Sequence, residues 1–311
     1  MSESSPKNAA TFAEPVFGRL LTAMVTPFKK SGEVDQEQTA QLAQDLVDRG
    51  HDGLVVCGTT GEYSTMTDQE NESVFRIVQE AVGDRAKIVA GVGSNDTAHT
   101  LELAARAEKV GVDGLLVVTP YYNKPTQAGL LAHFRSLADA VETPIMLYDI
   151  PGRAGIPIQL QTYLELAKHP NILAVKDAKA DFTAATEVMA ASKLQYYSGD
   201  DGLTLPWLAQ GAVGLVGVST HLAPELFREL IDATLAQNLA RAQELHLTLA
   251  PIVRACMSRV PGCVAAKQIL YWQERLACPL VRLPHVGPTP AEEQQIRADL
   301  AQAVIAETII R

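Results

Sequence analysis

The chain has 311 residues, 47% of them hydrophobic, and a formal net charge of −10 at neutral pH. This length and apolar content suffice for one large barrel or two ordinary domains, and the negative charge disfavours nucleic acid and anionic membrane surfaces as general partners. Residues 1–15 lack the apolar core of a signal peptide and no later apolar run approaches a membrane span, so we expect a cytoplasmic protein that acts on a small molecule.

Eight candidate strands follow one another along the chain. Three of them, at 49–56, 110–118 and 210–218, share a pattern of glycine, two residues, glycine and an apolar run. The first glycine suits the left-handed end of a helix and the run suits a strand buried on both faces, so each stretch predicts a helix-to-strand joint. The other candidates are at 20–27, 87–94, 144–151, 172–178 and 195–201.

Helical patterns fill the gaps between these strands, for example at 35–50 and 67–84, where apolar residues recur three and four positions apart. The alternation predicts a parallel sheet, and eight such units favour an α/β fold of the (β/α)8 TIM-barrel type. An open Rossmann sheet is the alternative, although the chain has no GxGxxG after its first strand and no P-loop sequence.

Only helical patterns continue after residue 238. We therefore expect a polar N-terminal extension at 1–14, a catalytic barrel at 15–238 and a small C-terminal helical domain at 239–311. The last part is too short to look independent, so its helices are expected to pack on the barrel or on a neighbouring subunit.

Reactive residues of such barrels gather at the carboxyl ends of the strands. This rule selects the following side chains and backbone positions: Thr59, Thr60, Glu62, Tyr121, Tyr122, Tyr148, Arg153, Lys176, Gly199, Asp200 and Asp201.

Lys176 heads this set because it follows an apolar strand run. Burial disfavours a charged amine, so its pKa falls and the neutral form becomes available to attack a carbonyl. The alternative is a structural lysine paired with Asp177 or another carboxylate. Successive strand residues point to opposite faces, which directs Asp177 away from Lys176 and favours Schiff-base chemistry.

Three other features of this set have both a functional and a structural interpretation. The Tyr148 phenol could move protons beside the amine, or could be a core tyrosine with a satisfied hydroxyl. Arg153, in a tight PGRAG loop, could bind a substrate carboxylate, although surface arginines are common. The hydroxyls of GTTGE at 58–62 could bind a carboxylate, or the segment could be a plain turn.

Metal-binding signatures are absent from the sequence. The histidines form no HExxH and no close pair, and the cysteines form no CxxC. We therefore expect no metal site.

Several of these segments occur in the order typical of one family. GTTGE, TPYYNKPTQ at 119–127, YDIPGRAG at 148–155, VKDAK at 175–179 and SGDD at 198–201 make the chain resemble dihydrodipicolinate synthases, especially actinobacterial ones, within the N-acetylneuraminate lyase superfamily. The resemblance covers nearly the whole chain. It implies a (β/α)8 barrel with a short helical C-terminal domain, assembled as a homotetramer of tight dimers.

The resemblance also implies roles for individual residues. Lys176 would form an imine with pyruvate, and Tyr148, Thr60 and Tyr122 would relay protons, with Tyr122 supplied across the tight-dimer interface. Arg153 would bind the carboxylate of L-aspartate 4-semialdehyde. Thr59 and Thr60 would contact pyruvate, and Gly199 and Val216 would line the pocket. The implied activity, 4-hydroxy-tetrahydrodipicolinate synthesis for diaminopimelate and lysine, needs neither a metal nor an organic cofactor.

Many members of that family are inhibited by lysine at the tight-dimer interface. The corresponding positions here are Tyr63, Ser64, Asp68, Asn71, Asn95, His99 and Tyr121. His99 stands where inhibited members have a glutamate, and Tyr63 replaces a serine. A histidine does not supply the negative charge, so we expect weak or absent inhibition by lysine.

Two alternative functions stay open. One is another pyruvate aldolase of the superfamily, such as N-acetylneuraminate lyase or a 2-keto-3-deoxy-sugar-acid aldolase, which would use the same lysine. The other is a barrel that binds a metabolite without catalysis.

Overall fold

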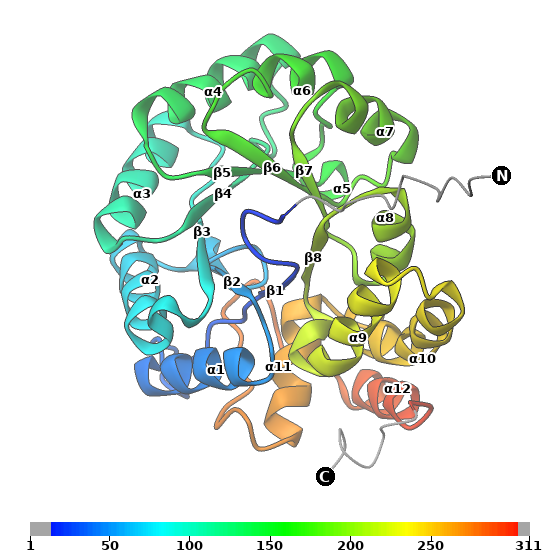
Figure 1. Ribbon diagram of the computed structural model, residues 1–311. Helices are drawn as coiled ribbons and strands as arrows, with labels where there is room; N and C mark the ends of the chain where they lie inside the picture. The colour runs from blue at the N-terminus through cyan, green and yellow to red at the C-terminus, as the bar shows by residue number, and fades with distance from the viewer. Residues whose placement is uncertain (1–13, 304–311) are drawn as a thin grey trace, which may run out of the picture.

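The computed structural model describes residues 14–303, and the expected barrel is confirmed (Figure 1). Eight parallel strands pair in chain order, and the last pairs with the first, so the sheet closes on itself. The strands are β1 (Leu20–Ala23), β2 (Gly53–Val56), β3 (Lys87–Gly91), β4 (Gly114–Val118), β5 (Ile145–Asp149), β6 (Ile172–Asp177), β7 (Gln195–Ser198) and β8 (Gly214–Gly217).

The first strand is shorter than the sequence predicts. It ends at Ala23, and two residues later the Val25 amide donates to Nε2 of His221 at 3.2 Å instead of to a strand. Pro27 lacks an N–H altogether. The apolar run from 20 to 27 is therefore buried throughout although only its first half is a strand.

Helices surround the barrel (Figure 1), and several of them begin at side-chain caps that the sequence supplies. Asp35 accepts the Gln38 amide at the start of α1, and Thr67 and Glu70 form a capping box at α2. The helices are α1 (Gln36–Asp48), α2 (Asp68–Val82), α3 (Thr97–Val110), α4 (Gln127–Ala140), α5 (Pro151–Ala154), α6 (Leu160–Leu166), α7 (Phe182–Ala191), α8 (Thr204–Gln210) and α9 (Pro224–Leu235), with 3-10 turns η1 (Tyr63–Thr65), η2 (Gly83–Arg85), η3 (Asp201–Leu203) and η4 (Ser219–His221).

The glycines of the three helix-to-strand joints adopt the expected conformation. Gly50, Gly111 and Gly211 have φ angles of 97°, 83° and 114°, in the left-handed region that favours glycine. The chain turns there from helix to strand, so these joints set the regular alternation of the barrel.

Three further helices follow the barrel: α10 (Leu239–Met257), α11 (Gly262–Trp272) and α12 (Pro290–Leu300). In Figure 1 they lie beside α9 and α1, and α10 packs on α9 and α12. The division into a barrel domain and a C-terminal domain stays a prediction. The predicted N-terminal extension lies outside the described residues except for Glu14.

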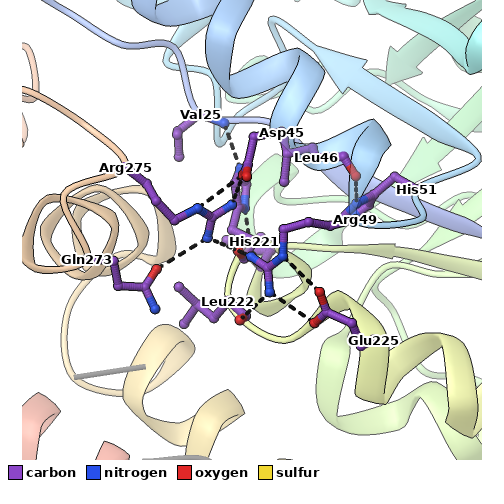
Figure 2. A network of polar contacts seen from close by, with 11 residues as sticks. Val25, Asp45, Leu46, Arg49, His51, His221, Leu222, Glu225, Gln273 and Arg275 are labelled. Carbon is purple, nitrogen blue, oxygen red and sulfur yellow. Dashed lines mark hydrogen bonds and ion pairs between the residues drawn. The ribbon is translucent and has the colours of Figure 1, made fainter. Parts of the chain in front are cut away.

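A polar network joins the C-terminal region to the barrel (Figure 2). Arg275, just beyond α11, binds Asp45 of α1 and donates to the His221 carbonyl at 2.6 Å. Arg49 donates to Glu225 at 2.8 Å and to the same carbonyl at 3.2 Å. Burial lowers the pKa of His221 to about 3, so this histidine is neutral in the network.

No single helix within residues 14–303 is long and apolar enough to cross a membrane. Helices α10 and α11 pass a length and composition test only as a pair bent by 104°. Most of α11 is buried inside the chain, as is usual for a core helix.

Candidate active site

Lys176 and Tyr148 lie side by side at the carboxyl ends of two neighbouring strands. They are paired in the register of β5 and β6, and the Lys176 Nζ lies 4.4 Å from the centroid of the Tyr148 ring. Both side chains are buried, at 5% and 6% exposure. Within the described residues Lys176 has no hydrogen bond or ion pair, so its amine is free to react.

Burial is the main influence on the Lys176 amine. It lowers the pKa of Lys176 from 10.5 to about 8; Asp201 opposes this effect and Arg153 adds to it. Burial also raises the pKa of Tyr148 to about 12. At neutral pH the phenol therefore keeps its proton while a useful fraction of the amine is uncharged.

Asp177 makes no ion pair with Lys176. Its carboxylate accepts the backbone amides of Lys179 and Ala180 at 2.9 and 2.8 Å. Asp149, its register partner on β5, accepts the Tyr163 hydroxyl at 2.9 Å. The strand alternation thus gathers the amine and the phenol on one face and the two carboxylates on the other.

The backbone of Gly199 lies against Lys176. A Cβ at this position would lie 3.1 Å from Cγ of Lys176 and 2.8 Å from the Asp177 carbonyl oxygen. Glycine is therefore required for the close approach of this backbone to the lysine stem.

A cavity of about 370 Å³ opens beside these strand ends. A small inner cavity, lined in part by Tyr148, shares Thr59, Tyr63 and Val118 with it. The outer cavity is lined by Thr59, Tyr63, Ser64, Val118, Tyr121, Ile150, Arg153 and Ala154. Together they form one apolar site with an exposed arginine at its outer part.

The threonines of GTTGE have free hydroxyl groups. Among the described residues neither Thr59 nor Thr60 makes a side-chain hydrogen bond, and both are partly buried. Thr59 lines the cavity, whereas Thr60 is not among its lining residues. Both hydroxyls are available to a ligand.

Of the predicted catalytic and substrate-binding residues, Thr59, Tyr148 and Arg153 line these cavities, whereas Lys176, Thr60, Gly199, Tyr122 and Val216 are not among the lining residues. Tyr122 is 88% exposed, with its backbone at φ 74°, and Val216 is buried in β8 with 1% exposure. One chain by itself therefore does not place the Tyr122 phenol beside Lys176.

The positions that the family resemblance associates with lysine inhibition separate into those that line the outer cavity and those that do not. Tyr63, Ser64 and Tyr121 line the outer cavity. His99 Nε2 lies 3.0 Å from Asp68, and the Asn95 carbonyl accepts from the Asn123 amide at 2.8 Å. Asn71 is buried and donates to the Tyr63 carbonyl at 3.4 Å.

Sequence reasoning missed several residues around the site. The cavity is also lined by Val118, Ile150 and Ala154. Val118 and Ile150 lie at the carboxyl ends of β4 and β5, where reactive residues of such barrels gather, so this pattern could have identified them. Lys267 of α11 is fully buried and forms an ion pair with Glu62 of GTTGE. No local sequence pattern predicts this pair. Within residues 14–303 no three His, Cys, Asp or Glu side chains are grouped for a metal ion.

Comparison with known proteins gives a consistent result. The Dihydrodipicolinate synthetase family matches residues 16–303. A 4-hydroxy-tetrahydrodipicolinate synthase of Kineococcus radiotolerans is 51% identical over 96% of this chain and 97% of that protein. One of Acidothermus cellulolyticus is 53% identical over 94% of each.

Solved structures agree with the sequence matches. A dihydrodipicolinate synthase from Aquifex aeolicus has a TM-score of 0.90 and 36% identity, covering 95% of this chain and all of that one (100%). A lysine-bound enzyme from Cyanidioschyzon merolae has a TM-score of 0.90 and 37% identity, with the same coverage.

Proposed function

The chain belongs to the dihydrodipicolinate synthetase family, and from this premise we propose that it condenses pyruvate with L-aspartate 4-semialdehyde through a Schiff base on Lys176. The reaction is that of 4-hydroxy-tetrahydrodipicolinate synthase, a lyase of diaminopimelate and lysine biosynthesis. The observation that carries the proposal is the buried Lys176 amine, unpaired among the described residues, 4.4 Å from the Tyr148 ring.

The chemistry begins at the neutral Lys176 amine. It adds to the keto carbon of pyruvate, and loss of water gives the imine. The imine then loses a methyl proton to become an enamine, whose carbon attacks the aldehyde. The amine of the second substrate finally displaces Lys176 as the ring closes, so the enzyme is regenerated without a cofactor.

Tyr148 is the proton carrier nearest to the reacting nitrogen. Its pKa of about 12 keeps the phenol protonated at neutral pH, so it donates a proton to the leaving hydroxyl and takes one back later. The Thr59 and Thr60 hydroxyls bind the pyruvate carboxylate, and Arg153 binds the carboxylate of the semialdehyde at the outer cavity. Gly199 and Val216 contribute through their backbones.

A second subunit completes the relay in this proposal. Tyr122 is 88% exposed on its own chain, so its phenol is accessible to the site of a second copy that packs against it. We place Tyr122 in the site of a neighbouring subunit within a homotetramer of tight dimers. The protein is proposed to work in the cytoplasm.

Borohydride trapping tests the proposal directly. Pyruvate and borohydride are expected to add one reduced pyruvyl group, located at Lys176 by peptide mass spectrometry. Lys176→Ala removes the adduct, while Lys87→Ala, at the opposite end of the barrel, retains it. Absence of the adduct in the wild-type enzyme refutes the proposal and favours a binding protein.

The second substrate is tested with aldehydes. Fast turnover is expected with aspartate semialdehyde and slow turnover with sugar aldehydes. The reverse order would indicate an aldolase of the sugar-acid type.

A further inference from the structure

We propose that Lys267, from the C-terminal helical region, is a positioning residue that fixes the Thr59–Thr60 loop through a buried ion pair with Glu62. The inference rests on the proposed function, because it concerns how the pyruvate-binding hydroxyls are held. Lys267 does not touch the substrate in this proposal. It acts through Glu62, the last residue of GTTGE.

The Lys267 ammonium is held on several sides. The residue is 0% exposed within α11. Its Nζ donates to Oε1 of Glu62 and, at 3.0 Å, to the Leu280 carbonyl, and it lies 4.0 Å from the centroid of the Phe28 ring. An ammonium is costly to bury without such partners. The position of the Lys267 ammonium therefore fixes the position of the Glu62 carboxylate.

The Glu62 carboxylate is held by both oxygens. Oε1 accepts from Lys267, and Oε2 accepts the Arg282 backbone amide at 2.8 Å. Both donors come from the chain after the barrel. The carboxylate therefore ties the loop after β2 to two separate points of the C-terminal region.

The loop itself needs such support. Cys57 and Glu62, at its two ends, have φ angles of 51° and 58°, which are unfavourable for residues other than glycine. Between them, a Cβ on Gly61 would lie 3.0 Å from the Cys57 amide nitrogen, so the turn is tightly wound. Contacts outside the loop must hold this conformation, and the buried carboxylate supplies two of them.

The two threonines lie inside this strained turn. The Glu62 amide donates to the Thr59 carbonyl at 3.1 Å, so a shift of Glu62 moves the threonine backbone directly. The Thr59 and Thr60 hydroxyls make no hydrogen bond among the described residues, and the turn has one further contact from outside, because the Thr26 hydroxyl donates to the Gly61 carbonyl at 2.7 Å. Loss of the ion pair is therefore expected to displace the hydroxyls that bind pyruvate, and to leave Lys176 and Arg153 in place.

Lys267→Met tests the inference, with Glu62→Gln as a second variant that keeps the side-chain shape. Arg259→Met is the matched control, because it removes an ion pair to Asp299 within the C-terminal region without touching the loop. All variants are compared as the full-length assembly, with circular dichroism to confirm folding. The readouts are the KM for each substrate and the rate of pyruvate trapping.

We expect a KM for pyruvate raised about tenfold or more in both ion-pair variants, since small misplacements of binding groups have large effects. The KM for the semialdehyde and the pH midpoint of trapping should stay unchanged, and the control should match the wild type. A merely structural pair would reduce the active fraction without changing the KM.

A folded Lys267→Met or Glu62→Gln enzyme whose KM for pyruvate stays within threefold of the wild type would overturn the inference. Failure of the proposed function looks different, because wild-type enzyme would then form no pyruvate adduct at all.

Discussion

The pH dependence of pyruvate capture follows from the burial of Lys176. A pKa of about 8 leaves about a tenth of the amine neutral at pH 7, whereas the usual 10.5 would leave roughly 0.03%. The site thus increases the reactive fraction roughly 300-fold at pH 7. Because only the neutral amine attacks, the capture rate should rise with pH and level off just above pH 8.

The assay mixes enzyme with limiting pyruvate, without aldehyde, and quenches with borohydride at short times. Adduct is counted by intact mass, and the second-order rate constant is plotted against pH from 6 to 10. Asp201→Asn provides a perturbation of known sign. Asp201 raises the pKa of Lys176, so its neutralisation should move the midpoint to lower pH.

The Asn side chain can keep the main contacts of Asp201. Oδ1 accepts the Val218 and Ser219 amides, at 3.0 and 2.7 Å, and an amide oxygen can do the same. Only the longer contact of Oδ2 with the Val218 amide, at 3.2 Å, is lost. A rate that still climbs tenfold per pH unit at pH 9 and 10 would refute the reasoning, because the amine would then have an ordinary pKa.

Three further outcomes are expected. Tyr148→Phe keeps the ring beside Lys176 but loses the hydroxyl, so kcat should fall by about 10² or more while slow trapping of pyruvate persists; near-normal kcat would exclude the proton-carrier role. L-Lysine should inhibit weakly or not at all, because His99 stands in place of the carboxylate of inhibited relatives and already contacts Asp68. Half-inhibition below about 1 mM lysine in an activity titration would contradict this, since weak ligands bind in the millimolar range. The pKa of His221 is about 3 in the folded chain and 6.5 in the unfolded chain, so between these pH values the unfolded chain binds more protons than the folded one. The free energy of unfolding should therefore decrease as the pH falls from 6.5 towards 3. Between pH 7 and pH 5 this histidine should cost about 2 kcal/mol, measured as the difference in urea-unfolding free energy between wild type and His221→Gln; equal losses in the two proteins would contradict it.

Much of the barrel and the centre of its site could be predicted from local patterns. Gly111 and Gly211, which have positive φ angles, indicate the end of a helix. The apolar run after each of them indicates a buried strand. Strand alternation then separates Lys176 from Asp177. These features depend only on near neighbours in sequence, which is why reading along the chain finds them.

The rest depends on distant partners. Lys267 and Glu62 are 205 positions apart, and a lysine in an apolar helix gives no sign of the carboxylate that it meets. The short β1 likewise depends on His221, far along the chain. The role proposed for Tyr122 depends on a second subunit, and a local sequence pattern does not describe contacts between subunits.

The paired register of β5 and β6 also bears on how preparations of this enzyme should be quantified. If either strand slipped by one residue against the other, its side chains would turn to the opposite face of the sheet. The carboxylate of Asp149 or Asp177 would then point into the barrel in place of the Tyr148 phenol or the Lys176 amine. Misassembled chains would then be inert instead of weakly active. The fraction of chains that carry a reduced pyruvyl adduct would therefore measure the fraction of correctly assembled barrels. The specific activity of a refolded sample should be proportional to this fraction.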